Sequence, residues 1–225
     1  MFFKSQAHWQ QEIAPCAQTL FGDNLICLFH QNWRVSVFLH SNNPKDLPDF
    51  APFLKILSKA KASLAYIFSP EMVFSAADTF PLEFLELSHR HTVLAGEFPL
   101  TGFTPDLASL RHQCERELRG YLIHLRREAA IHSQSSKDMQ SMIAATLPQF
   151  DTVFLGIFWL TQAGRFPQGR SQCLETIDQT WQLGNLFSRL VNPPKDVKEL
   201  RWLVGDYILG IETILKSIDR MEVPS

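Results

Sequence analysis

The feature that most constrains this chain is an abrupt change of pattern at Thr104-Pro105-Asp106. Before this point, short apolar runs bounded by Gly, Asn and Pro alternate with short amphipathic segments, which is typical of a small α/β domain. After it, apolar residues recur at spacings of three and four, which predicts helices alone. We therefore predict an α+β protein with two domains, residues 1–103 and residues 104–225.

The first domain is predicted to contain a mixed sheet. Leu25 to Phe29 is a continuous apolar run, and Trp33 to Leu39 alternates between two faces, so both predict strands. Further strands are predicted over 62–68, 81–87 and 91–94. Helices are predicted over 5–20 with a break near Pro15, over 50–60, and from Ser69-Pro70, where Ser is a good N-cap and Pro suits the first helical position.

The second domain is predicted to be an all-α four-helix bundle with short connections. The first helix is expected to begin with Thr104 as N-cap and Pro105 at the first helical position. The second is expected from about Ser136, and Pro148 should kink or split it. The third and fourth are expected after Gly169 and from about Asp196.

Composition excludes several classes of protein. The formal net charge of −2 gives no global attraction to nucleic acid or to an anionic membrane, although a local basic patch stays open. The four cysteines lie far apart and form no Cys-x-x-Cys pair, so we expect reduced, buried thiols and no zinc site. The N-terminal residues contain no apolar run long enough for a signal peptide. We therefore expect a cytoplasmic protein that does not associate with membranes.

The order helix, strand, turn, strand, helix, strand, then helices resembles the nucleotidyltransferase superfamily that includes DNA polymerase β and the kanamycin-type transferases. Three segments carry the resemblance and together cover most of residues 18–127. They are Leu20-Phe-Gly-Asp-Asn-Leu-Ile-Cys-Leu-Phe29, Thr79-Phe-Pro-Leu-Glu-Phe-Leu-Glu-Leu87 with His91-Thr-Val-Leu-Ala-Gly96, and Leu110-Arg-His-Gln-Cys-Glu-Arg-Glu-Leu-Arg-Gly120 with Leu125-Arg126. The resemblance implies a nucleotidyltransferase-like α/β domain followed by a helical bundle.

The chain departs from this family where the chemistry would occur. Active members carry two carboxylates at alternate positions of the second strand, where they hold two divalent metal ions. The corresponding positions here are Arg34 and Ser36, and residues 24–45 contain no Asp or Glu. The Gly-Ser turn that cradles a phosphate in the family is replaced by His30-Gln31. The resemblance therefore implies a degenerate member without a metal site.

Our leading hypothesis from the sequence is a catalytically inactive, nucleotidyltransferase-like protein without a cofactor, acting as a binding or regulatory module. A nucleotide could still bind in the residual cleft, for which the candidate residues are His30, Arg34, Ser36, Arg111 and Arg119. A partner protein or a second copy could bind the helices. For Arg111 and Arg119 a structural alternative exists, because each lies four residues from Glu115 and can pair with it along a helix.

Two rival hypotheses stay open. In the first, the protein is an active Mg²⁺-dependent nucleotidyltransferase that uses Asp23, Glu83 or Glu86 in an unusual site. Glu83 and Glu86 would point to opposite faces of the predicted strand 81–87, which weakens their case. His89 and His91 would share one strand face, but no third metal ligand lies nearby. In the second, the chain is a structural dimer built through its helices. The sequence names no substrate, partner, pathway or oligomeric state.

Overall fold

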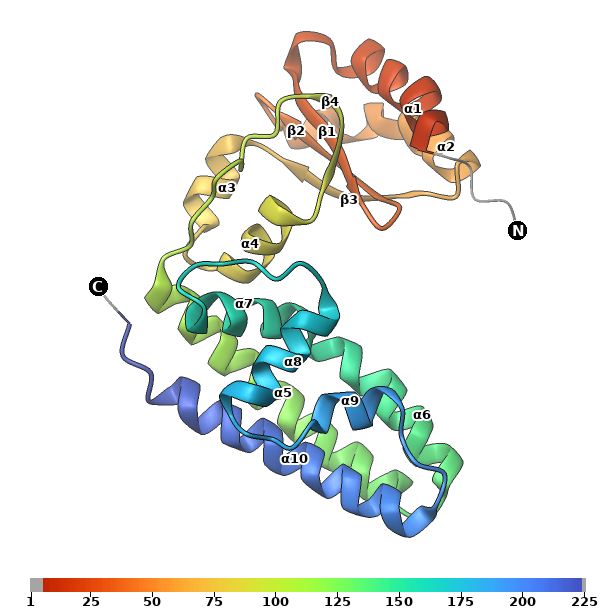
Figure 1. The fold of residues 1–225 in the computed structure, drawn as a ribbon. Helices are drawn as coiled ribbons and strands as arrows, with labels where there is room; N and C mark the ends of the chain where they lie inside the picture. The colour runs from red at the N-terminus through yellow and green to blue at the C-terminus, as the bar shows by residue number, and fades with distance from the viewer. Residues whose placement is uncertain (1–5, 224–225) are drawn as a thin grey trace. The chain divides into compact units, whose positions relative to one another are not determined.

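The computed structural model describes residues 6–223, with side chains from Glu12 onward, and its fold is α+β (Figure 1). The chain divides into two compact units. The first comprises residues up to Ala77 together with Leu87–Phe103. The second comprises Asp78–Glu86 and the residues from Thr104 onward. Each unit has its own hydrophobic core, so each is described by itself.

The first unit is built on a mixed sheet, as predicted. In the described residues it contains four strands, β1 (Leu25–Gln31), β2 (Arg34–Leu39), β3 (Ser63–Phe68) and β4 (Thr92–Gly96). Their order in the sheet is β3-β2-β1-β4. β1 is antiparallel to both β2 and β4, whereas β2 and β3 are parallel. The parallel pair needs a crossover connection, which α2 (Ala51–Lys59) supplies.

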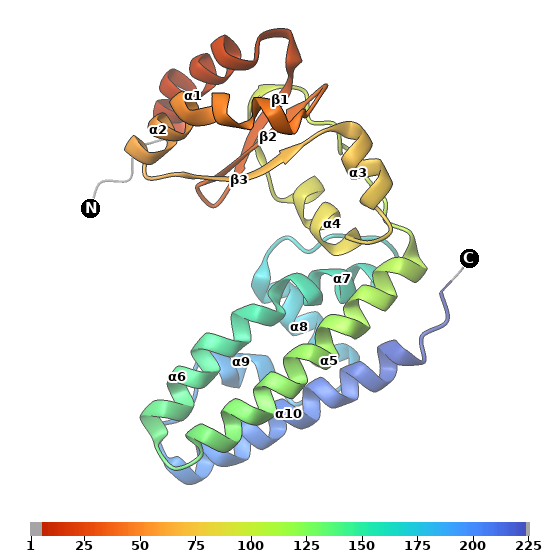
Figure 2. The same cartoon turned by 180° about the vertical axis from the view of Figure 1, so that it is seen from behind.

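One face of the sheet is covered by α1 (Gln6–Phe21) and α2, which lie side by side in Figure 2. Ile13 and Ala17 of α1 and Phe53 and Leu57 of α2 are buried with Val35 in one core. The remaining short elements of this unit are η1 (Gly22–Asn24), η2 (Pro44–Phe50) and α3 (Pro70–Ala76). α3 begins as predicted, because the Ser69 hydroxyl accepts a hydrogen bond from the Met72 amide.

The predicted break of the first helix at Pro15 is wrong, since α1 runs through this residue. A proline removes one backbone hydrogen bond from a helix interior and normally costs about 3 kcal/mol. Here Ile13, Ala14 and Ala17 are buried against the sheet on either side of Pro15, and the Thr19 hydroxyl donates to the Pro15 carbonyl. Packing of the apolar stripe therefore outweighs the local preference for a break.

The predicted strand over 81–87 is also wrong, because the segment forms helix α4 (Pro81–His89). The sequence Pro-Leu-Glu-Phe-Leu-Glu-Leu fits both periods in part, since Leu82 and Phe84 are two apart, as in a strand, whereas Leu82 and Leu85 are three apart, as in a helix. Both leucines are buried in the core of the second unit. Pro81 stands at the first position of the helix, where a missing amide proton costs nothing.

The second unit is helical but differs from the predicted four-helix bundle. Its described residues form η3 (Leu147–Phe150) and, besides α4, six α-helices: α5 (Leu107–His132), α6 (Ser136–Thr146), α7 (Asp151–Thr161), α8 (Arg170–Thr180), α9 (Leu186–Val191) and α10 (Val197–Asp219). Pro148 splits the predicted second helix, and residues 181–185 interrupt the third. The N-cap of α5 is Asp106, which accepts from the Ser109 amide, rather than Thr104.

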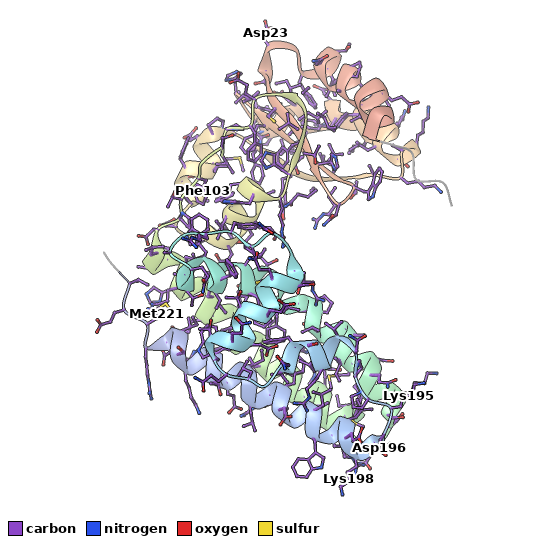
Figure 3. All side chains as sticks on the ribbon, viewed as in Figure 1. Asp23, Phe103, Lys195, Asp196, Lys198 and Met221 are labelled. Atoms are coloured by element: carbon purple, nitrogen blue, oxygen red, sulfur yellow. The ribbon has the colours of Figure 1, made fainter. Side chains whose placement is uncertain are left out.

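The long helices α5 and α10 pack against each other and frame the core of this unit. Asp196 caps α10 by accepting from the amides of Lys198 and Glu199 (Figure 3). Among the described residues, one segment, 136–161, has the length and the mean hydropathy of 1.4 that a membrane span requires. Because 61% of its most apolar window is buried, this segment also fits the core of a folded unit.

Candidate functional site

The strand register brings three separate parts of the first unit to one end of the sheet. At this end Gln31 lies opposite Arg34, Arg34 opposite Ser63, and His30 opposite Thr92. The β1–β2 turn, the residues before β3 and the residues before β4 therefore meet here. The other end is marked by the pairs Leu25 with Leu39 and Cys27 with Gly96.

The first of these ends is basic. Its three segments, 30–34, 59–63 and 89–93, contain no Asp or Glu. They carry four cations, Arg34, Lys59, Lys61 and Arg90, which we call the basic edge. Arg34, Lys59 and Lys61 are exposed, and none of these three forms an ion pair with the residues that the structure describes. His30, His89 and His91 belong to the same segments.

The opposite end of the sheet is acidic. Residues adjoining it are Asp23 before β1, Asp46 and Asp49 after β2, Glu71 after β3 and Glu97 after β4. Lys45, which directly precedes Asp46, also lies at this end. Figure 3 labels Asp23 at the turn that leads into β1. Since strands rise about 3.3 Å per residue, the two ends lie roughly 20 Å apart. The charges of this unit are therefore segregated along the strand direction.

Arg34 is held against an aromatic ring rather than a carboxylate. Its guanidinium carbon lies 5.8 Å from the centre of the Tyr66 ring. Tyr66 in turn stacks on Phe68, with 5.0 Å between ring centres, and is 39% exposed. A cation–π contact restrains a guanidinium without neutralising it, so Arg34 keeps a full charge and its hydrogen-bond donors for a ligand.

The β1–β2 turn has a conformation that suits its length but not its residues. Asn32 and Trp33 have φ angles of 45° and 67°, as a two-residue hairpin turn of the primed type requires. Tryptophan rarely adopts a positive φ. Its ring packs partly on the core and stacks on His30 at 6.5 Å, and its carbonyl accepts from the Ser63 amide. An aromatic residue thus stands at the end of the sheet where the family resemblance implies a phosphate-binding turn.

The face of β2 that the resemblance implies for metal ligands is largely aromatic. Ser36 is 2% exposed, and Phe38 beside it is buried. The rings of Phe29 and Phe38 lie 5.7 Å apart, and Phe98 packs edge-on against both. His91 stacks flat on Phe98 at 3.6 Å, and its Nδ1 lies 2.7 Å from the Leu87 carbonyl oxygen. Burial lowers the pKa of both His91 and His30.

Glu83 and Glu86 lie on α4 rather than on a strand, and they bond to helices of the second unit. The Gln113 side chain donates to Glu83 at 2.8 Å and also accepts from the Leu82 amide. The Thr152 hydroxyl donates to Glu86 at 3.0 Å. On a helix, residues three apart share one face, so the expectation that these carboxylates diverge is wrong. Both take part in helix packing within the second unit.

Arg111 and Arg119 also have structural partners in the second unit. Both bind Glu115, and Arg119 binds Asp219 as well. The Arg111 guanidinium additionally donates to the carbonyls of Ile218 and Asp219 in the last turn of α10. These contacts join α5 to α10 and correspond to the structural alternative given above.

The described residues contain no group of three His, Cys, Asp or Glu side chains that could hold a metal ion. His89 ends α4 and His91 precedes β4, so the two lie in a connection, as the turn favoured from the sequence implies, and not on one strand face. Asp23 lies at the acidic end of the sheet, beyond the start of β1. The cysteines Cys16, Cys27, Cys114 and Cys173 form no disulfide, and burial raises the pKa of Cys27 to about 12.

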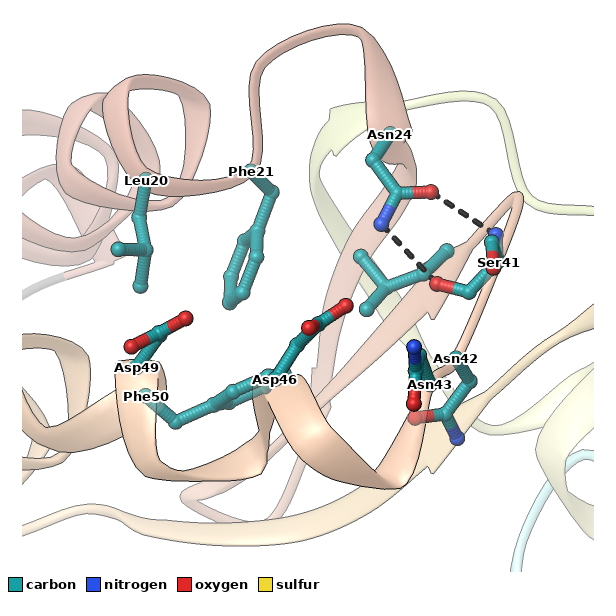
Figure 4. A pocket seen from close by; sticks show the side chains of 10 residues that line it. Leu20, Phe21, Asn24, Ser41, Asn42, Asn43, Asp46, Asp49 and Phe50 are labelled. Carbon is teal, nitrogen blue, oxygen red and sulfur yellow. Dashed lines mark hydrogen bonds between the residues drawn. The ribbon is translucent and has the colours of Figure 1, made fainter.

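A pocket of about 210 Å³ opens at the acidic end of the sheet (Figure 4). Asn24 closes one side by two hydrogen bonds with the Ser41 backbone, 3.0 Å to its carbonyl and 2.8 Å from its amide. The carboxylates of Asp46 and Asp49 lie on the side that faces Phe21. The pocket has the wrong charge for a phosphate and is distinct from the basic edge.

The sequence indicated His30, Arg34 and Ser36 as ligand candidates in this unit, but it did not place Lys59, Lys61 and Arg90 beside them. The sequence does contain a pattern that points to these cations, because the segments 30–34, 59–63 and 89–93 contain no Asp or Glu. The chain matches no family model, no curated protein and no solved structure. Its function must therefore be argued from its own geometry.

Proposed function

We propose that this chain is a catalytically inactive, nucleotidyltransferase-like protein whose first unit binds a phosphate-bearing ligand at the basic edge without a divalent metal ion. The observation that carries the proposal is the gathering of Arg34, Lys59 and Lys61, which are exposed and form no ion pair among the described residues, at the end of the sheet whose segments 30–34, 59–63 and 89–93 contain no Asp or Glu. Exposed cations that no carboxylate neutralises are the usual partners of phosphates.

The order of elements supports the ancestry. α1, β1, the two-residue turn, β2, α2 and β3 follow one another as the resemblance requires. The site chemistry supports inactivity. Mg²⁺ is normally held by one or two protein carboxylates together with substrate oxygens. The strand that should supply them carries a guanidinium at Arg34, a buried hydroxyl at Ser36 and a ring at Phe38.

Titration calorimetry with ATP and GTP, each with and without Mg²⁺, tests this function. We expect binding in EDTA, and weaker binding when Mg²⁺ neutralises part of the phosphate charge. The double variant Arg34→Ala/Lys61→Ala should lower the affinity at least tenfold. Lys45→Ala is the matched control, because it removes a cation from the opposite end of the sheet and should change little.

Two results would contradict the proposal. Nucleotide binding that requires Mg²⁺, or metal-dependent transfer of a nucleotide to any acceptor, would establish the active enzyme instead. Equal affinities for the wild type and the Arg34→Ala/Lys61→Ala variant would show that the nucleotide does not bind at the basic edge.

A second candidate function, self-association through the helices, is favoured by an exposed stripe on α10. Trp202 and Leu209 are 68% and 61% exposed and lie seven residues apart, on the same face. In an antiparallel pairing with a second copy centred on Leu209, Trp202 would face Lys216 and Gly205 would face Thr213. The first pair offers a cation–π contact, and the second pairs two small residues.

Light scattering over a range of concentrations tests self-association. We expect a dimer that Trp202→Ala and Leu209→Ala dissociate. Ile123→Ala is the control, because it removes an exposed apolar side chain from α5. A wild-type protein that stays monomeric at every concentration would rule this candidate out.

A further inference from the structure

We infer that the ligand of the basic edge presents a terminal phosphate, with two negative charges and three free oxygens, rather than an internal phosphodiester. This inference rests on the proposed function, because it names the ligand class of the same site. It depends on Arg34, Lys59 and Lys61 alone, which are exposed and form no ion pair among the described residues.

The three cations come from two neighbouring segments of the first unit. Arg34 begins β2 and lies opposite Ser63, the first residue of β3, whereas Lys59 and Lys61 lie just before β3. The Ser63 amide donates to the Trp33 carbonyl at 3.2 Å, which joins the two segments beside the cations. Because paired strands lie about 4.8 Å apart, long side chains from both segments can reach one group. This placement suits a single phosphate.

A structural role for the lysines accounts for only part of their charge. The C-terminus of a helix carries roughly half a negative charge, which a lysine in the last turn offsets. α2 ends at Lys59, and Lys61 follows two residues later. Together with Arg34, the lysines leave a surplus of roughly two and a half positive charges over the helix end. A terminal phosphate carries about 1.5 to 2 negative charges at pH 7 and a diester about one, so the terminal phosphate matches the surplus better.

Lys61 occupies a backbone position that glycine usually holds. Its φ angle is 57°. The Lys61 amide donates to the Ser58 carbonyl at 3.0 Å, and the Ala62 amide donates to the Leu57 carbonyl at 2.9 Å, which is the Schellman arrangement at a helix end. A lysine in this left-handed conformation bears a strain that glycine avoids. Because its exposed ammonium forms no ion pair among the described residues, the conformation points to a role of this group in binding.

Arg34 supplies the directional part of the site. A guanidinium has five donors in one plane and can bind two oxygens of the same phosphate. The contact of Arg34 with the Tyr66 ring, at 5.8 Å, restrains the guanidinium before a ligand arrives. A terminal phosphate has three free oxygens, enough for the guanidinium and both ammonium groups, whereas a diester has two.

Titration calorimetry in EDTA with AMP, cyclic AMP and adenosine tests the inference, because the three share a base and a sugar but differ in the phosphate. We expect AMP to bind at least tenfold more tightly than cyclic AMP, in which the phosphate is a diester, and adenosine not to bind. Ribose 5-phosphate distinguishes the sources of a terminal phosphate. An affinity equal to that of AMP would identify a sugar phosphate as sufficient, and a tenfold weaker one would identify a nucleotide.

The pH dependence of the preference for AMP is a second test. The second pKa of a terminal phosphate is near 6, so roughly a tenth of AMP keeps both charges at pH 5, whereas cyclic AMP stays singly charged. His30, His89, Arg90 and His91 belong to the segments of the same end. Protonation of these histidines would raise the affinity for both ligands, so the ratio of the two affinities is compared. We expect this ratio to fall at least threefold from pH 7.5 to pH 5.0.

Lys61→Gly separates binding from structure, because glycine suits the positive φ of this position. The midpoint of thermal unfolding should not fall, whereas the affinity for AMP should fall at least fivefold. Lys45→Ala is the matched control from the opposite end of the sheet and should leave the affinity unchanged. Circular dichroism confirms that each variant is folded, and that the wild type is folded at both pH values.

The outcomes distinguish this inference from the proposed function. If cyclic AMP binds at the basic edge as tightly as AMP, or if the ratio of their affinities does not change with pH, the inference fails and the proposed function stands. Full AMP affinity in Lys61→Gly would also overturn the inference. If adenosine binds as tightly as AMP, or if no phosphate ligand binds, both fail.

Discussion

Arg34 of the first unit and several arginines of the second unit have opposite surroundings, although nothing in the residue type distinguishes them. Three arginines of the second unit connect helices. Arg126 pairs with Glu212, Arg170 with Asp151 and Arg189 with Asp206. In the first unit Arg34 rests on an aromatic ring with no carboxylate beside it among the described residues. The difference teaches that partners, rather than counts of charged residues, separate the cations that hold helices together from those that we propose bind a ligand.

The largest expected effect tests whether the second unit serves stability and not binding. Phe150 is buried among the rings of Tyr121, Phe154 and Tyr207. Phe150→Ala should lower the free energy of unfolding by about 3–5 kcal/mol, because it leaves a cavity in this core. Urea unfolding followed by circular dichroism measures the loss. ATP affinity in the absence of urea should be unchanged, and a parallel loss of affinity would contradict a purely structural role of this core.

Arg111 is expected to give the next largest effect. Arg111→Met keeps the packing of the aliphatic stem but removes the donors to Glu115 and to the carbonyls of Ile218 and Asp219. The loss of stability should be about 1–3 kcal/mol, as for a partly buried charged hydrogen-bonding group. If the variant has unchanged stability but binds nucleotide more weakly, Arg111 contacts the ligand and is not a structural residue.

Asp178 probes a polar contact in the interior of the second unit. Its carboxylate accepts from the Phe187 amide at 3.1 Å in the first turn of α9, and burial raises its pKa. Asp178→Ala should cost about 1–2 kcal/mol, because it leaves a buried amide without its acceptor. Thermal unfolding measures the change. Asp178→Asn, which keeps an acceptor, should recover most of it, and an equal loss in both variants would contradict this account.

The buried histidines of the first unit and the buried Asp178 of the second should respond in opposite directions to acid. Burial lowers the pKa of His30 and His91 in the first unit, so their neutral forms are favoured on folding. Their contribution to stability is present above the unfolded value near 6.5 and is lost as the pH falls toward the folded values. For Asp178 the pKa is raised, so its contribution is present below the unfolded value and is lost as the pH rises.

Urea midpoints from pH 7.5 to 5.5, followed by amide exchange to resolve each unit, measure this difference. The first unit should weaken over this range, and His91→Phe should reduce the dependence. The nearby His89 also lowers the pKa of His91, so His89→Ala should reduce the pH dependence as well, by a smaller amount than His91→Phe. A first unit whose stability is constant over this range would show that the burial of these imidazoles has no energetic consequence.

The smallest expected change in stability is at Arg34, and it sharpens the contrast with Arg111. Arg34→Met should alter the free energy of unfolding by less than about 0.5 kcal/mol, because the side chain is exposed and forms no ion pair among the described residues. The same substitution should weaken ATP binding several-fold. Strong destabilisation by Arg34→Met would mean that its contact with Tyr66 is structural.

Local patterns in the sequence predicted the elements whose burial is simple. The continuous run before Phe29, the alternation up to Leu39 and the segment 62–68 are strands, as expected. Where a segment fits two periods, the neighbouring elements decide. Residues 81–89 form a helix because a helix places both Leu82 and Leu85 in the core of the second unit. Pro15 stays within a helix because the residues on either side of it are buried.

What the sequence by itself determined is the absence of carboxylates from residues 24–45, which excludes paired carboxylate metal ligands from this segment. What the tertiary structure alone decided is which cations gather. Arg34, Lys61 and Arg90 are 27 and 29 residues apart in succession. They share an edge because β2 and β3 run parallel while β1 and β4 run antiparallel. Strand direction arises from long-range packing, which no local pattern encodes.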